Sequence, residues 1–319
     1  MDRTPVLGVP QPAGTAERTG EPLGPPAAGR GTVTRELVHR ARETDVLPAS
    51  WESLGEDRFT VRAKWPDTHE VFVAPDGRPD PVLLVETLRQ SAILLCHAAF
   101  AVPLDHHFLM EDLHYRARPG LLDVAGGPAE LRLDVECSGI RRRGASLAAT
   151  DCRMHVREGE RTVATGGGRL NISTPRAYRR LRGAHLPPAM AALAIPVPHG
   201  LVGRSGPTQV VLAPTPESGR WQLRADPGNT TLFGRATDHY PGMILVEAAH
   251  QAARALLSPA SFRPASFTIR FHRYVEFAPP CWIEAHTVPT RVTGATAVRV
   301  VGRQGGHAVF TASLTGAER

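Results

Sequence analysis

Two segments about half a chain apart share one pattern, an apolar helix interrupted by a single glutamate. They read PVLLVETLRQSA (81–92) and GMILVEAAHQAA (242–253). Glu86 and Glu247 are 161 residues apart, and the glutamine four residues after each keeps the same offset. Both segments are apolar almost all round, which is typical of a helix enclosed by its own domain.

The offset of 161 residues extends beyond the helices. It takes Pro66 to Pro227 and Phe72 to Phe233, in the stretches that precede each helix. Several matches in register indicate an internal duplication. His69 faces a threonine in the second copy, so the two copies are not chemically equivalent.

We expect the two helices at 81–100 and 241–257. Segments with a strand pattern precede and follow each of them. Apolar and polar residues alternate at 59–65, 129–140, 145–156, 161–172, 221–226, 265–277, 281–288, 296–301 and 307–314. Short Gly-bearing turns between them indicate antiparallel pairing. A long helix wrapped by a curved antiparallel sheet is the hotdog arrangement. We therefore predict an α+β double hotdog, since a β-sandwich has no place for two long buried helices.

Composition shifts divide the chain into four parts. Residues 1–30 are rich in Pro, Gly and Ala, and we expect a disordered tail. The first hotdog unit is placed at 31–172 and the second at 206–319. Between them, 173–205 reads as a linker with one short helix, because prolines and basic residues occur there without a sustained period.

The positive charge does not by itself indicate a nucleic-acid partner. The net charge is +6, but Lys64 is the one lysine among 37 basic residues, and the chain has 30 Gly and 29 Pro. An Arg-, Gly- and Pro-rich composition is what a GC-rich genome produces regardless of function. Four cysteines show no metal-ligand spacing, so we expect no metal site. Without an export segment or an 18-residue apolar run, we expect a cytoplasmic protein and no membrane partner.

Longer motifs resemble a known family. PGMILVEAAHQAA is similar to the central-helix segment of hotdog dehydratases. VHRARETDVL (38–47), DPVLLVETLRQ (80–90) and DHYPGMILVEAAHQA (238–252) together resemble the A-factor synthase (AfsA) family, over roughly residues 35–315.

The resemblance implies an acyltransferase that needs no organic cofactor. Members of the family move a β-ketoacyl group from an acyl-carrier-protein thioester onto the hydroxyl of dihydroxyacetone phosphate. The product is a precursor of γ-butyrolactone or butenolide signals. The expected partners are therefore the loaded carrier protein, or coenzyme A in its place, and the three-carbon phosphate.

This chain departs from the family pattern at His250, where the second motif usually carries arginine, whereas the first motif keeps Arg89. A histidine is charged only part of the time near neutral pH. Arg254, one turn further on, is a substitute for the missing cation. The segment FVAPDGRPDP (72–81) has no clear counterpart of the dehydratases' catalytic histidine, which argues against dehydration.

Glu86 and Glu247 are the candidate catalytic residues. Burial disfavours the carboxylate and raises its pKa. One of the two, with Glu86 preferred, is a candidate general base for the acceptor hydroxyl. The structural alternative is an ion pair with Arg89, three residues on.

The starts of the two helices also differ. Pro81 has no N–H, whereas Gly242 and Met243 can donate to an oxyanion. We therefore expect a composite site, with Glu86 from one half and Gly242 with His239 from the other. The structural alternative for Asp238 and His239 is a helix cap.

Arginines are the candidates for binding the phosphate. We expect Arg89 and Arg254 to do so ahead of Arg270 and Arg273, because most of the many arginines should be solvated. His69 either orients a carboxylate or ends a strand.

The glycines of GGGR (166–169) are interpreted as a bulge or turn rather than a phosphate loop, because no GK[ST] ending follows.

Two other functions stay open. The first is a thioesterase or dehydratase of the same fold, which would not depend on dihydroxyacetone phosphate. The second is a non-enzymatic protein that binds acyl lactones and would tolerate Glu86→Gln.

Overall fold

The computed structural model describes residues 30–123, 125–126, 130–183, 193–234 and 237–318. The expected tail lies outside these residues, apart from Arg30. In the first half the elements are β1 (Arg30–Thr32), β2 (Pro48–Gly55), β3 (Arg58–Lys64), α1 (Pro81–Ala98), β4 (His107–Met110), β5 (Asp112–Ala117), β6 (Glu130–Arg143), β7 (Ser146–Glu158) and β8 (Arg161–Ser173).

The second half follows the short helix α2 (Pro175–Arg182). Its elements are β9 (Leu212–Pro214), β10 (Arg220–Leu223), α3 (Thr230–Phe233), α4 (Gly242–Leu257), β11 (Phe262–Phe271), β12 (Cys281–Val288), β13 (Thr296–Gln304) and β14 (His307–Glu318). Short 3₁₀ turns lie at Arg35–Val38, Glu43–Asp45, His199–Val202 and Pro207–Gln209.

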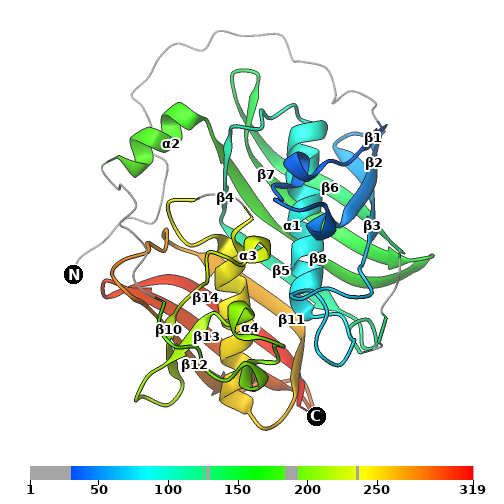
Figure 1. Ribbon diagram of the computed structural model, residues 1–319. Coiled ribbons are helices and arrows are strands. Elements are labelled where there is room, and N and C mark those ends of the chain that lie inside the picture. Colours follow the sequence, from blue (N-terminus) through cyan, green and yellow to red (C-terminus); the bar gives the residue numbers. More distant parts are fainter. Residues whose placement is uncertain (1–29, 124, 127–129, 184–192, 235–236, 319) are drawn as a thin grey trace.

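The described strands form one antiparallel sheet that runs through both halves. Its order is β1-β2-β3-β6-β7-β8-β5-β11-β14-β13-β12-β10-β9, and β4 pairs with β8. The halves meet where β5 pairs with β11, with Tyr115 opposite Phe267. Figure 1 shows the curved sheet of each half around its own long helix. The predicted double hotdog is confirmed.

Helix α1 begins where a cap and a proline coincide. Asp80 accepts a hydrogen bond from the Val82 amide at 3.0 Å, and Pro81 occupies the first turn, where its missing N–H costs nothing. The helix is buried on nearly every face. Each leucine enclosed in this way, such as Leu84 or Leu95, stabilises the fold by roughly 1.5–3 kcal/mol.

Helix α4 begins differently, after Pro241, and no side chain caps it. The structural alternative in which Asp238 or His239 caps this helix is therefore wrong. Helices α1 and α4 contact each other across the junction of the two halves. Neither is long and apolar enough to cross a membrane, and the same holds for the other helices in the described part of the chain.

Two features of the first half differ from the sequence interpretation. Strands β1, β2, β4 and β5 were not predicted; β4 and β5 are short, and Glu111 separates them. Gly166, Gly167 and Gly168 do not form a turn or bulge, since they lie inside β8 and pair with β7 on one side. On the other side Gly166 and Gly167 pair with β5.

The segment predicted as a linker, 173–205, contains the expected short helix, α2. Its last residues pack with the second half. Val197 donates a backbone hydrogen bond to Leu212, and Arg204 is 2% exposed. We propose that the second unit begins near Val197.

Candidate functional site

Glu86 lies on α1 with no exposed surface, held by two arginines and a glutamine. The Nε of Arg40 donates to Oε1 at 2.8 Å. Arg89 donates to both carboxylate oxygens, at 2.9 and 2.8 Å, so the predicted pair three residues apart is present. Gln90 donates to Oε1 at 2.6 Å. The carboxylate is therefore surrounded by donors, and two of the donors are cations.

Glu247 occupies the matching place on α4 and is also fully buried. Arg204 donates to both of its oxygens, with the Nε bond at 2.7 Å, and Gln251 donates to Oε1. His250 stands where the first half has Arg89, yet it bonds to its own helix at the Val246 carbonyl, 2.9 Å away. One arginine thus contacts Glu247, where two contact Glu86.

Each of the two glutamines holds the segment that leads from a 3₁₀ turn into a strand, β2 in the first half and β9 in the second. Gln90 accepts from the Leu47 amide at 2.9 Å and donates to the Asp45 carbonyl at 2.7 Å. Gln251 does the same with the Val211 amide and the Gln209 carbonyl, at 2.9 and 2.7 Å. The duplication therefore includes the polar network and not only the apolar helix.

Sequence reasoning missed Arg40 and Arg204. Each is almost fully buried and reaches across to the other half: Arg40 donates to the Thr231 carbonyl, and Arg204 to the Val71 carbonyl at 2.7 Å. The signal was available, because Val-x-Arg occurs at both 38–40 and 202–204. That offset is 164 rather than 161, so a search at fixed spacing passes over it.

The expected rise in pKa at Glu86 is wrong. Burial alone raises the pKa of this carboxyl, but Arg40 and Arg89 outweigh burial and lower the pKa to about 2. Glu86 is therefore ionised at neutral pH and a very weak base. This argues that it positions the two guanidinium groups rather than accepting a proton.

The expectation that His250 is partly charged near neutral pH is also wrong. His250 is 1% exposed, and burial lowers its pKa to about 4. Its ring lies 4.6 Å from that of Phe267, and Nε2 has no partner among the described residues. A neutral imidazole at this position cannot replace the charge of an arginine.

Arg254 pairs with Asp80, the residue that caps α1. Its Nη2 lies 2.9 Å from Oδ2 of Asp80, and Arg204 reaches the same oxygen at 3.2 Å. Two arginines, Arg204 and Arg254, thereby face two carboxylates, Asp80 and Glu247. The second site is a closed network without excess positive charge.

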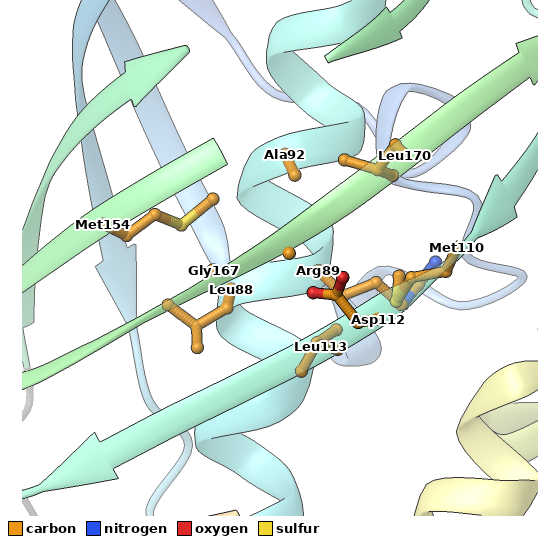
Figure 2. A pocket seen from close by; sticks show the side chains of 10 residues that line it. Leu88, Arg89, Ala92, Met110, Asp112, Leu113, Met154, Gly167 and Leu170 are labelled. Carbon is orange, nitrogen blue, oxygen red and sulfur yellow. The ribbon is translucent and has the colours of Figure 1, made fainter. Parts of the chain in front are cut away.

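Arg89 lines a small cavity between α1 and the sheet. Figure 2 shows Leu88, Arg89 and Ala92 of α1 beside the strands that carry Met110, Asp112, Leu113, Met154 and Leu170. The cavity holds about 10 Å³, room for about one water molecule.

The start of α4 contacts β11, which pairs with β5, and β5 lines this cavity. A Cβ on Gly242 would meet the Phe271 ring at 3.5 Å, and the Phe271 amide donates to the Glu111 carbonyl at 2.9 Å. Asp112, the next residue, lines the cavity with Arg89. A chain of contacting residues in β5 and β11 therefore connects Arg89 of the first half with Gly242 of the second.

His239 belongs to a polar cluster at the same helix start. Its Nδ1 lies 2.6 Å from Oδ1 of Asp238. The same oxygen accepts from the Tyr178 hydroxyl at 2.7 Å, and Oδ2 accepts from Nε of Arg182 at 2.9 Å. Burial raises the pKa of Asp238, but its three donors lower it well below the usual range. The ionised carboxylate only accepts, so Nδ1 of His239 carries a proton and Nε2 is the acceptor end of the neutral ring.

His69 orients a carboxylate, one of the two roles considered for it. Its Nδ1 accepts from the Val71 and Phe72 amides, both at 3.1 Å, so Nε2 donates to Asp45 at 3.0 Å. Arg270 and Arg273 are both exposed. The described residues contain no cluster of three or more His, Cys, Asp or Glu side chains that could hold a metal ion.

Comparison with known proteins identifies close relatives. The chain is 43% identical to the 2-oxo-3-(phosphooxy)propyl 3-oxoalkanoate synthase of Streptomyces coelicolor, over 89% of this chain and 91% of that protein. It is 43% identical to the Streptomyces griseus enzyme of the same name, over 88% and 94%. With the Streptomyces virginiae enzyme the identity is 42%, over 88% and 96%.

Solved structures are more distant. A putative oleoyl thioesterase from Lactobacillus plantarum aligns over 81% of this chain and 95% of its own, with a TM-score of 0.49 and 9% identity. The 12:0-ACP thioesterase from Umbellularia californica aligns over 82% and 94%, with a TM-score of 0.49 and 11% identity.

The model of the A-factor biosynthesis hotdog domain, AfsA, matches residues 26–173 and 187–317. Both halves are covered, and the chain belongs to the AfsA family.

Proposed function

We propose that this protein is an acyltransferase that moves a β-ketoacyl group from a thioester onto the hydroxyl of dihydroxyacetone phosphate. The observation that carries the proposal is identity of 42–43%, over nearly the whole of both chains, to synthases named for this phosphorylated ester. The donor would be a carrier-protein or coenzyme A thioester, used in the cytoplasm. No metal or organic cofactor is required.

Glu86, in the first half, would hold in place the arginines that bind the substrate. Two arginines, Arg40 and Arg89, pair with the carboxylate of Glu86, and the buried carboxylate of Asp45 also acts on Arg40. Arg89 keeps 13% of its side chain exposed, so it would be the arginine of this pair that a phosphate contacts. Glu247, His250 and Arg254 would have a structural role, because the second network is balanced in charge.

His239 would be the general base. The acceptor hydroxyl loses its proton to Nε2 while its oxygen attacks the thioester carbonyl carbon. The tetrahedral intermediate collapses, the carbon–sulfur bond breaks, and the thiolate takes the proton back from His239. Asp238 would hold the ring in the correct tautomer and stabilise the imidazolium that forms.

The start of α4 would stabilise the oxyanion. Gly242 and Met243 are at the first turn of a helix that no side chain caps, so their N–H groups are available. Donors at such a position stabilise the charge that develops on the carbonyl oxygen.

Purified protein is mixed with β-ketoacyl thioesters of several chain lengths and with dihydroxyacetone phosphate, and mass spectrometry follows the phosphorylated ester. We expect His239→Asn to lower kcat by roughly 10²–10⁴-fold. Arg89→Met should raise KM for dihydroxyacetone phosphate, whereas the matched Arg254→Met in the other half should leave that KM unchanged.

Two outcomes would contradict the proposal. If no ester forms at any acyl chain length, the protein does not catalyse the proposed acyl transfer. Release of the free acid at the same rate with and without dihydroxyacetone phosphate would identify a thioesterase instead. Folding of each variant is checked by circular dichroism before kinetics, because Arg89 also pairs with Glu86.

A further inference from the structure

The short helix α2 has two chemically different faces. Tyr178 and Arg182, four residues apart, point to one side and contact the rest of the protein. Arg176 and Arg180 lie on the opposite side, Arg179 lies on the flank next to Arg182, and all three are exposed. The helix PRAYRRLR contains no acidic residue. The described part of the chain supplies no acidic partner to these three arginines.

The inner face fixes α2 firmly at the candidate site. Arg182 donates to Glu276 at 2.6 and 2.8 Å and to Asp238 at 2.9 Å, and it lies 4.5 Å from the centre of the Tyr274 ring. Tyr178 stacks on His107 of β4, with ring centres 3.6 Å apart. The helix therefore cannot swing freely, and its outer face has a defined orientation.

The stability of the helix does not explain the outer arginines. Cations in the last turn, such as Arg179 and Arg180, interact favourably with the helix dipole. Arg176 is in the first turn, where a cation is unfavourable, and it lies four residues before Arg180, where like charges repel. Arg176 is thus unfavourable for the helix, and none of the three arginines has an acidic partner among the described residues.

We propose that the outer face of α2 docks an acidic acyl-carrier protein that delivers the β-ketoacyl thioester. This inference rests on the proposed function. Charge complementarity is one argument. The other is continuity, because the helix that presents these arginines also donates to Asp238, the residue that orients His239. Figure 1 shows α2 at the edge of the molecule, beside neither central helix, where a second protein can approach.

The test compares two donors that carry the same acyl group, one on the carrier protein and one on the small thiol N-acetylcysteamine. Arg179→Glu/Arg180→Glu should raise KM for the carrier-protein donor at least about tenfold, and more at low salt than at high salt. The KM for the small donor should stay within about twofold, because that donor does not touch α2.

A matched control reverses two exposed arginines elsewhere, Arg291→Glu/Arg299→Glu. Arg299 lies on β13, opposite Ser313 of β14, and Arg291 lies in the turn that precedes β13. The control should leave both KM values within about twofold of the wild type. Equal KM changes for both donors, or no change for the carrier-protein donor, would overturn the docking proposal.

Direct binding separates this inference from the proposed function. Fluorescence anisotropy measures the affinity of labelled carrier protein for each variant without any turnover. If neither donor gives ester but the α2 variant still binds the carrier protein tenfold more weakly, the acyltransferase proposal is contradicted and the docking proposal is supported. If ester forms with both donors and binding is unchanged, the docking surface fails alone.

Discussion

At the scale of single residues, the environment of each buried carboxylate decides its chemistry. Glu86 and Glu247 have the same sequence context, and both are fully enclosed. Arg40 and Arg89 make Glu86 an ionised anchor with a pKa of about 2. Removing one member of a buried pair leaves an uncompensated charge, which is far more costly than losing an exposed pair.

His250 provides a pH-dependent test at this scale. Its pKa is about 4 in the folded protein and about 6.5 in the unfolded chain, so between these values the unfolded chain binds more protons. Its contribution to stability is therefore complete above about pH 6.5 and is lost as the pH falls towards 4. We expect the free energy of unfolding to fall by about 2 kcal/mol from this residue between about pH 7.5 and about pH 5.

The measurement is urea unfolding at both pH values. His250→Asn should lose about 2 kcal/mol less than the wild type over this interval. His286 is exposed on β12, so His286→Asn should keep the pH dependence of the wild type. Identical pH dependence in the wild type and His250→Asn would contradict a buried neutral imidazole.

At the scale of elements, glycines permit the close packing of β8 against its neighbours. A Cβ on Gly168 would lie 2.3 Å from the Asp112 carbonyl oxygen, and one on Gly166 would lie 2.5 Å from the Leu88 side chain. Asp112 and Leu88 both line the cavity beside Arg89. Strand β8 therefore sets how closely the sheet approaches α1.

Gly168→Ala tests this packing. Because the clash is with backbone, the strands must separate, and we expect the free energy of unfolding to fall by about 1–3 kcal/mol. Gly206→Ala is the control, since a Cβ there meets no atom within 4 Å, and it should stay within about 0.5 kcal/mol of the wild type. Equal denaturation midpoints for the two variants would contradict the predicted constraint.

At the scale of the whole molecule, the two halves form a single structure. The sheet is continuous through β5 and β11, and the Tyr115 hydroxyl donates to the Pro264 carbonyl across this seam at 2.9 Å. Asp80 of the first half binds Arg204 and Arg254 of the second. Neither half completes its polar network alone.

The halves should consequently unfold together. Trp51 and Trp65 report on the first half, and Trp221 and Trp282 on the second, so variants that keep one pair can be followed by fluorescence in urea. We expect coincident transitions for the two reporters, and Asp80→Ala should lower both midpoints equally. Separate midpoints, or a shift confined to one reporter, would show independent halves.

The sequence by itself determined the duplication, the two enclosed helices, the antiparallel strands around them and the burial of both glutamates. The spacing of apolar residues indicates which residues are buried, and the constant offset between the halves indicates the duplication. The helices and strands depend on little besides this local pattern. Tertiary structure alone decided that Arg40 and Arg204 reach these carboxylates, since they lie 46 and 43 residues before Glu86 and Glu247 in the chain. It also decided that Asp80 serves the other half and that Asp238 orients His239. Ion pairing depends on where the fold places long side chains in space, and the order of residues along the chain does not record that position.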